Sequence, residues 1–156
     1  MTAPILKRPD DYRGFRISEA DTNYMIPIAD PVGDPGVGFT LIVEVYSKGG
    51  KTPPNSHAGA HELFFILRGE GRAYCDGHEA PIAPGDTVLL PPGTEHVIAN
   101  TGPGKLYALC LMVPNEEFAE LIHAGTEVPL DAEDRAVLAG VPLAAMAAQA
   151  AATGTA

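Results

Sequence analysis

Apolar residues along the chain fall into short runs that are separated by turn-forming residues. The run at 38–46, GFTLIVEVY, is dense in β-branched and aromatic residues and predicts a strand. The prolines and glycines that follow it predict a loop. Further strands are expected at 62–69, 70–77 and 105–114, with shorter ones between 78 and 100. Short strands at this spacing predict an antiparallel barrel or sandwich.

The pattern changes on both sides of this run of strands. Residues 1–36 are rich in Pro, Asp and Gly, and we interpret them as an N-terminal arm with short outer strands at 15–17 and 24–28. Residues 115–156 change to a helical pattern with a frayed tail, and Asn115 is the expected cap of the first helix. Helices are expected after Pro114, at 131–138 and, from an alanine-rich stretch, at 142–152. With a barrel at 37–114, the whole chain is expected to form one domain.

Charge and composition exclude several classes of partner. The chain of 156 residues has 20 acidic and 10 basic side chains, a formal net charge of −10, which repels nucleic acid and anionic membranes. No stretch has the apolar length of a membrane span or the pattern of a signal peptide, so a cytoplasmic location is expected. Cys75 and Cys110 lack the spacing of a zinc site and are expected to be reduced thiols.

Two spaced motifs occupy the middle of the chain. Residues 49–69 fit G-x5-N-x-H-x4-E-x6-G through Asn55, His57 and Glu62. Residues 85–100 fit G-x5-P-x-G-x2-H-x3-N through His96. Together they resemble the two motifs of the cupin superfamily, in the compact form of small single-domain bacterial cupins, with Asn55 where the first motif has a histidine. The resemblance implies an all-β jelly-roll barrel (a double-stranded β-helix) with short C-terminal helices, and a homodimer.

The resemblance also implies a mononuclear metal site built from three imidazoles and one carboxylate. The matching positions give His57, Glu62 and His96, with Asn55 in the remaining place. Such a donor set suits one divalent transition metal per chain, and Fe, Mn, Ni, Co and Zn are all compatible with it. Three possibilities remain for Asn55: it coordinates the metal weakly, it hydrogen-bonds a bound water, or it leaves the coordination position vacant.

The spacing of the first motif determines which side chains point inward. Asn55 and His57 are two residues apart and share a face of an extended chain. Glu62 is five residues beyond His57, so the chain has to bend at 58–60 to turn Glu62 inward, as in the same spacing of germin-type cupins. His61 then points to the opposite face and is only a fallback ligand.

Other candidate residues follow from alternation along the strands. Glu44 interrupts an apolar strand. Its side chain is either a buried acid in the barrel interior or lies on the outer side of the sheet, and the outer position is favoured. His78 and His123 are expected to be solvated. The expected lining of the ligand pocket is Phe64, Ile66, Ile98 and, more weakly, Tyr107.

The resemblance leaves several functions open. The first is a metal-dependent, dioxygenase-like enzyme that acts on a small oxygen-rich metabolite. A metal-dependent isomerase or lyase would use the same site, with Glu62 or a neighbouring acid moving the proton. The alternative is a module that binds a small ligand without turnover. A metal-free sugar-nucleotide epimerase would need a His/Asp/Tyr arrangement that the sequence lacks.

Overall fold

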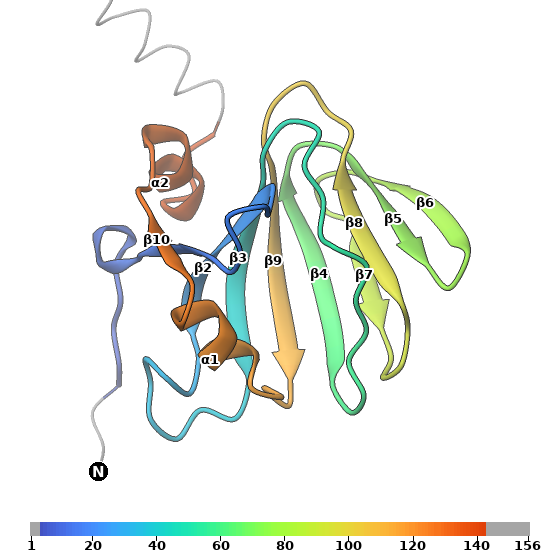
Figure 1. Cartoon of the computed structure of the whole chain (residues 1–156). Coiled ribbons are helices and arrows are strands. Elements are labelled where there is room, and N and C mark those ends of the chain that lie inside the picture. Colours follow the sequence, from blue (N-terminus) through green and yellow to red (C-terminus); the bar gives the residue numbers. More distant parts are fainter. Residues whose placement is uncertain (1–3, 143–156) are drawn as a thin grey trace, which may run out of the picture.

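Two antiparallel β-sheets face each other in the computed structural model, which describes residues 4–142 (Figure 1). The larger sheet has the strand order β10-β1-β2-β3-β9-β4-β7 and the smaller one the order β6-β5-β8. The strands are β1 (Gly14–Arg16), β2 (Asn23–Ala29), β3 (Thr40–Tyr46), β4 (His61–Arg68), β5 (Gly71–Cys75), β6 (His78–Ile82), β7 (Thr87–Leu90), β8 (His96–Asn100), β9 (Leu106–Val113) and β10 (Thr126–Val128). The helices are the 3-10 turn η1 (Pro9–Asp11), α1 (Phe118–His123) and α2 (Ala132–Leu138). The expected all-β jelly roll is confirmed.

The space between the sheets is filled by alternate residues of the strands. On β4, Phe64 and Ile66 are each 1% exposed, whereas Phe65 and Leu67 between and beyond them point out. Phe64 and Ile66 pack with Ile98 of β8, which is fully buried. This interior cluster holds the two sheets together through the hydrophobic effect.

Two motif residues have structural rather than chemical roles. Asn100 donates from its amide to the carbonyls of Tyr46, Ser47 and Gly104, and so joins the ends of three strands. Gly69 has φ +88°, and a Cβ there would lie 2.6 Å from the Lys105 carbonyl oxygen. The turn after β4 therefore requires glycine.

A second apolar cluster lies on the outer side of the larger sheet, where α2 covers it. It contains Tyr24, Val43 and Tyr107, with Val137 of α2 packed against them. The buried Asp134 of α2 accepts hydrogen bonds from the hydroxyls of Tyr24 (2.7 Å) and Tyr107 (2.8 Å). This position corrects the prediction for Tyr107, because its side chain packs under α2 and does not face the barrel interior.

The ends of the chain differ in detail from the sequence predictions. β1 and β2 of the N-terminal segment pair within the same chain, and β2 runs beside β3. The helix expected after Pro114 is α1, and its N-cap is Glu117 instead of the expected Asn115. The side-chain oxygen of Asn115 accepts a hydrogen bond from the backbone amide of Ala119. The helix expected at 131–138 is α2, with Asp131 as its cap. The alanine-rich helix expected at 142–152 lies almost wholly outside the described residues.

The outer face of β9, β4 and β7 carries apolar side chains in the described structure. Phe65 and Leu67 are 38% and 37% exposed, Val113 is 44% exposed and Leu89 is 60% exposed. Leu63 lies opposite both Leu89 and Leu111 in the strand register, so these positions form one continuous surface. We call Leu63, Phe65, Leu67, Leu89, Leu111 and Val113 the apolar face.

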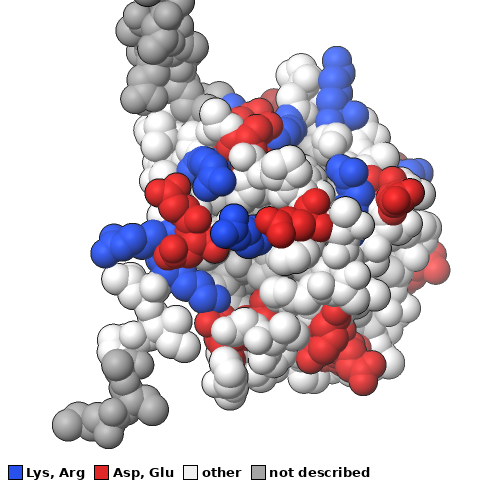
Figure 2. All heavy atoms as spheres, turned by 60° about the vertical axis from the view of Figure 1, so that its left-hand side comes forward, with Lys and Arg blue, Asp and Glu red and all other residues white. Residues whose placement is uncertain are grey.

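Charged side chains of both signs mix on the side of the molecule that carries α2 (Figure 2). There Lys105 pairs with Asp131 and Asp134, and Arg68 pairs with Glu133. No helix within residues 4–142 is long and apolar enough to cross a membrane.

Candidate metal centre

Three side chains from distant parts of the sequence meet at one point between the sheets. Glu62 comes from β4 of the larger sheet, His96 from the start of β8 in the smaller sheet, and His57 from the segment between β3 and β4. One potential ligand atom from each residue lies within 4.8 Å of the others. The convergence expected from the two motifs is therefore present in the structure.

Local backbone contacts hold the two histidines in position. The chain at Asn55 pairs with β8 through reciprocal bonds between the backbones of Asn55 and His96, of 3.3 and 2.9 Å. The Gly93 amide, in the turn before His96, donates to the His57 carbonyl at 2.7 Å. The proline-rich turn of the second motif thus positions both imidazoles.

Glu62 points inward because β4 begins after a bend. Glu62 is 4% exposed, whereas His61 beside it is exposed on the opposite face. The Gly59 amide in the bend donates to the Glu116 carboxylate at 2.5 Å. His61 is accordingly placed outside the cluster.

The donor atoms of the cluster converge without forming aligned hydrogen bonds. The Glu62 Oε2 atom lies 2.9 Å from His96 Nε2 and 3.3 Å from His57 Nε2. All three atoms are buried, and none has a hydrogen-bond partner of acceptable geometry. Buried polar atoms normally have partners, so three unpartnered atoms that face one point fit the ligands of a cation. Two imidazoles and a carboxylate are a donor set that divalent transition metals accept.

The ionisation of Glu62 suits this role, whereas His96 has to lose a proton before it can bind a metal. Burial alone would raise the pKa of Glu62, but the ring N–H groups of His57 and His96, the charge of His96 and the Cys110 thiol outweigh it and lower the pKa to about 2. Burial lowers the pKa of His96, and the carboxylate of Glu62 more than reverses this, so the net shift is upward. Glu62 is therefore an anion at neutral pH, as a ligand must be.

The remaining polar atoms of two ligands are held by neighbouring groups. The Nδ1 atom of His96 lies 3.1 Å from the Thr94 carbonyl oxygen, which favours a proton on Nδ1 and a free lone pair on Nε2. Glu62 Oε1 accepts a hydrogen bond from the Cys110 thiol at 3.1 Å, which leaves Oε2 for the cluster. Sequence analysis missed Cys110, because its proximity to Glu62 depends on the register between β9 and β4.

Aromatic and aliphatic side chains surround the cluster. The ring of Phe64 lies 6.1 Å from that of His96, and Phe118 at the start of α1 lies 6.1 Å from His57. Ile66 and Ile98 belong to the same interior cluster. His57 is the most exposed ligand, with 18% of its side chain accessible, so the cluster meets solvent on the side of His57 and Phe118.

The structure places the other predicted residues as follows. Asn55 is exposed and lies opposite His96, so the two side chains point to the same side of the sheet, and a role for Asn55 at the metal stays a prediction. Glu44 is 2% exposed, so the favoured outer position was wrong. His123 was expected to be solvated, but its Nε2 atom lies 3.0 Å from Asp30 Oδ2 and its side chain is only 26% exposed.

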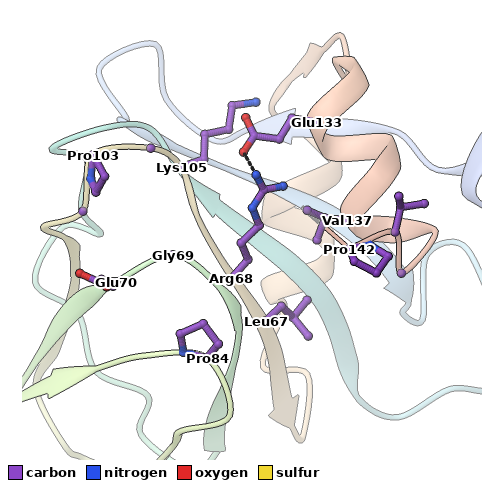
Figure 3. A pocket seen from close by; sticks show the side chains of 14 residues that line it. Leu67, Arg68, Gly69, Glu70, Pro84, Pro103, Lys105, Glu133, Val137 and Pro142 are labelled. Carbon is purple, nitrogen blue, oxygen red and sulfur yellow. Dashed lines mark ion pairs between the residues drawn. The ribbon is translucent and has the colours of Figure 1, made fainter. Parts of the chain in front are cut away.

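A cavity of ≈740 Å³ lies at the far end of β4 from the cluster (Figure 3). Leu67 and Arg68 at the end of β4 line it on one side, and Glu133 and Val137 of α2 line it on the other. Arg68 pairs with Glu133 across it at 3.1 Å. Because Glu62 and Leu67 are five residues apart on one strand, about 17 Å, this cavity is separate from the metal cluster.

Comparison with known proteins agrees with the geometry. The family model described as Cupin domain matches residues 42–112, the segment that contains all three cluster residues. This segment is a cupin domain. The crystal structure of a predicted oxalate decarboxylase from Thermotoga maritima superposes with a TM-score of 0.63 over 70% of this chain and 99% of that chain. At 23% identity, this likeness shows that the cupin fold is shared.

Two relatives match this chain in sequence. An uncharacterized protein of Methanocaldococcus jannaschii is 34% identical over 79 residues, which are 51% of this chain and 63% of that protein. The oxalate-binding protein of Thermotoga maritima is 36% identical over 69 residues, which are 40% of this chain and 57% of that protein. The matched region thus spans less than two thirds of either relative.

Proposed function

We propose that this cupin is a metal-dependent enzyme of the dioxygenase-like kind that acts on a small, oxygen-rich metabolite. The observation that carries the proposal is the convergence of three buried, unpartnered donor atoms from His57, Glu62 and His96. A structural role would not require these polar atoms to lie unpaired inside the barrel. Perturbed ionisable groups of this kind mark functional sites.

The residues of the site have separable roles in this proposal. A divalent transition metal would act as a Lewis acid toward substrate oxygens and, in a dioxygenase, as the redox centre. Glu62, ionised at neutral pH, and the two Nε2 atoms would hold it. Phe64, Ile66 and Ile98 would keep bulk water from the reacting groups, which strengthens electrostatic interactions there.

Metal analysis tests the ligand assignment. Protein purified without added metal is expected to contain one transition metal per chain by inductively coupled plasma mass spectrometry. His96→Ala is expected to lose it, whereas Asn55→His should bind it more tightly, because imidazole is the better donor. His61→Ala is the matched control, since it removes the exposed imidazole beside Glu62 and should retain the metal. Equal metal content in the His96 and His61 variants would refute the assignment.

A second candidate function is ligand binding without turnover. It is favoured by the similarity to the oxalate-binding protein of Thermotoga maritima. Oxygen uptake by the metal-loaded protein, measured with diketones, 2-oxo acids and hydroxy acids, separates the candidates. Substrate-dependent uptake supports the dioxygenase. Tight binding with neither uptake nor a changed ligand supports the binding module, and conversion of the ligand without oxygen uptake supports an isomerase or lyase.

The cupin is also proposed to form a homodimer through the apolar face. Exposed apolar surface of this extent on adjacent strands is typical of an interaction site. A second copy fits it because none of its six residues is charged, so a twofold axis would bring no like charges together despite the net charge of −10.

A further inference from the structure

Glu44 is a buried acid of the barrel that belongs to neither motif and to no metal cluster. It lies on the inward side of β3 between Ile42 and Tyr46, and all three residues are at most 2% exposed. In the strand register it is opposite Ala108, whose small side chain leaves room for the carboxyl group. Its Oε1 atom accepts a hydrogen bond of 2.5 Å from the amide of Asn23, which is also buried.

Glu44 differs from the other buried acids in having no ion-pair partner. Asp34 pairs with Lys7 at 2.5 Å, Asp134 with Lys105 at 2.8 Å and Asp30 with His123 at 3.0 Å. Within residues 4–142, the polar neighbours of Glu44 are neutral groups, the amide of Asn23 and the hydroxyl of Tyr46. No lysine or arginine of that range is among the buried side chains, so the barrel interior holds two carboxyl groups and no fixed cation.

An unpaired carboxyl group in this position is unfavourable for folding. Burial raises the pKa of Glu44 to about 7, and the hydroxyl of Tyr46 and the amide of Asn23 offset the shift only in part. A residue that costs stability and lies in the barrel interior beside a candidate metal site is a candidate for a role in function.

Glu44 acts electrostatically on the metal cluster. Ile42, the neighbour of Glu44 on the inward side of β3, lies opposite Cys110 of β9, and the Cys110 thiol donates to Glu62 at 3.1 Å, so Glu44 lies beside the cluster. The charges of Glu62 and His96 accordingly contribute to the pKa of Glu44. These groups therefore share one poorly screened interior, where charges interact more strongly than in water.

We infer that Glu44 is a specificity-determining residue that disfavours dianionic ligands such as oxalate and favours singly charged, hydroxyl-bearing ligands such as 2-hydroxy acids. The inference rests on the proposed metal site. A divalent ion with Glu62 leaves one positive charge, which a monoanion neutralises. A dianion leaves an excess negative charge beside Glu44, and no interior cation compensates it. If this chain shared the ligand of the oxalate-binding protein of Thermotoga maritima, the opposite preference would be expected.

The test compares two probes of similar size, oxalate and glycolate, on metal-loaded protein by isothermal titration calorimetry. Glu44→Gln keeps the shape and removes the charge. At pH 8.5, where Glu44 is ionised, we expect it to raise oxalate affinity by about tenfold or more, because it removes a like charge, and to leave glycolate affinity within about twofold. The matched control is Glu127→Gln, which removes one exposed negative charge on β10 and should change neither affinity.

The outcomes separate this inference from the proposed function. Metal content is measured first, and a wild-type protein that binds no metal overturns both proposals. If the wild type and Glu44→Gln both load metal but their oxalate-to-glycolate affinity ratios agree within about twofold, Glu44 does not set specificity and only this inference fails. If the glutamine variant does not fold, the oxalate and glycolate affinities are compared with those of Glu44→Leu, whose side chain suits an apolar interior.

Discussion

At the scale of single residues, the candidate metal site depends on the groups that orient Glu62 and His96 as much as on those two side chains. The Cys110 thiol engages one oxygen of Glu62, and the Thr94 carbonyl engages one nitrogen of His96. Each contact leaves one donor atom of the ligand directed at the cluster. Such supporting contacts fix ligand orientation and affect metal affinity.

Cys110→Ala is expected to weaken metal binding by about tenfold, because Glu62 loses the hydrogen bond that orients it. Cys110→Ser keeps a donor at this position and is expected to restore most of the affinity. Competition with a chromophoric chelator measures both variants. A loss shared equally by the alanine and serine variants would show that packing, not the hydrogen bond, is responsible.

Glu44 is expected to give the metal-free protein a distinctive pH dependence. Its pKa is about 7 when folded and 4.5 when unfolded, so between these values the unfolded chain releases the proton first. The free energy of unfolding therefore falls as pH rises from 4.5 to 7, by about 3 kcal/mol from this group. Glu62 has the opposite shift, and its contribution is lost only as pH falls from 4.5 toward 2.

Urea unfolding of the chelator-treated protein at pH 5 and pH 8 measures this effect. The wild type is expected to lose more stability than Glu44→Gln on going to pH 8. The comparison of variants is needed because the raised pKa of His96 gives a fall in the same direction. Equal losses in the two proteins would contradict the assigned shift.

At the scale of elements, the motifs predicted the site because their spacing carries the geometry. The odd step from His57 to Glu62 required a bend, and the structure has it. Glu44 was misplaced because both faces of β3 are buried, one by the smaller sheet and the other by the cluster under α2, so alternation does not identify the inner face. Tyr107 was misplaced because only the register of β9 shows that its neighbours Ala108 and Cys110 point inward.

The attachment of α2 depends on one buried carboxylate. Asp134→Ala would leave the hydroxyls of Tyr24 and Tyr107 without their acceptor and Lys105 without its buried partner. We expect a loss of about 3 kcal/mol in the free energy of unfolding. Urea unfolding measures it, with Asp131→Asn as the control. That change keeps a capping side chain and removes a partly exposed ion pair, so it should cost at most about 1 kcal/mol.

At the scale of the whole molecule, the chain covers only part of the outer side of its larger sheet. α2 and its neighbours cover the Tyr107 end, and the apolar face on β9, β4 and β7 is left to solvent. Stable dimers need about 800 Å² of buried surface on each partner, which a sheet face of this kind can supply.

Leu89→Glu places a charge in the apolar face and is expected to convert the dimer into a monomer, because a twofold contact would oppose two buried charges. Light scattering coupled to size-exclusion chromatography measures the mass against the 16.3 kDa of one chain. Leu121→Glu on α1 changes a leucine of similar exposure, 52% against 60% for Leu89, outside the apolar face and should remain dimeric. A monomeric wild type would reject the proposed interface.

The distribution of the three ligands over the two sheets has a mechanical consequence. Glu62 belongs to the larger sheet, whereas His96 belongs to the smaller one, and the chain at His57 runs beside β8. An ion bound by all three would act as a cross-link between the halves of the sandwich and would add its binding free energy to the folded state. Removal of that ion should therefore accelerate amide hydrogen exchange first at the start of β8 and along residues 55–57, while the amides of β2 and β3 keep their protection.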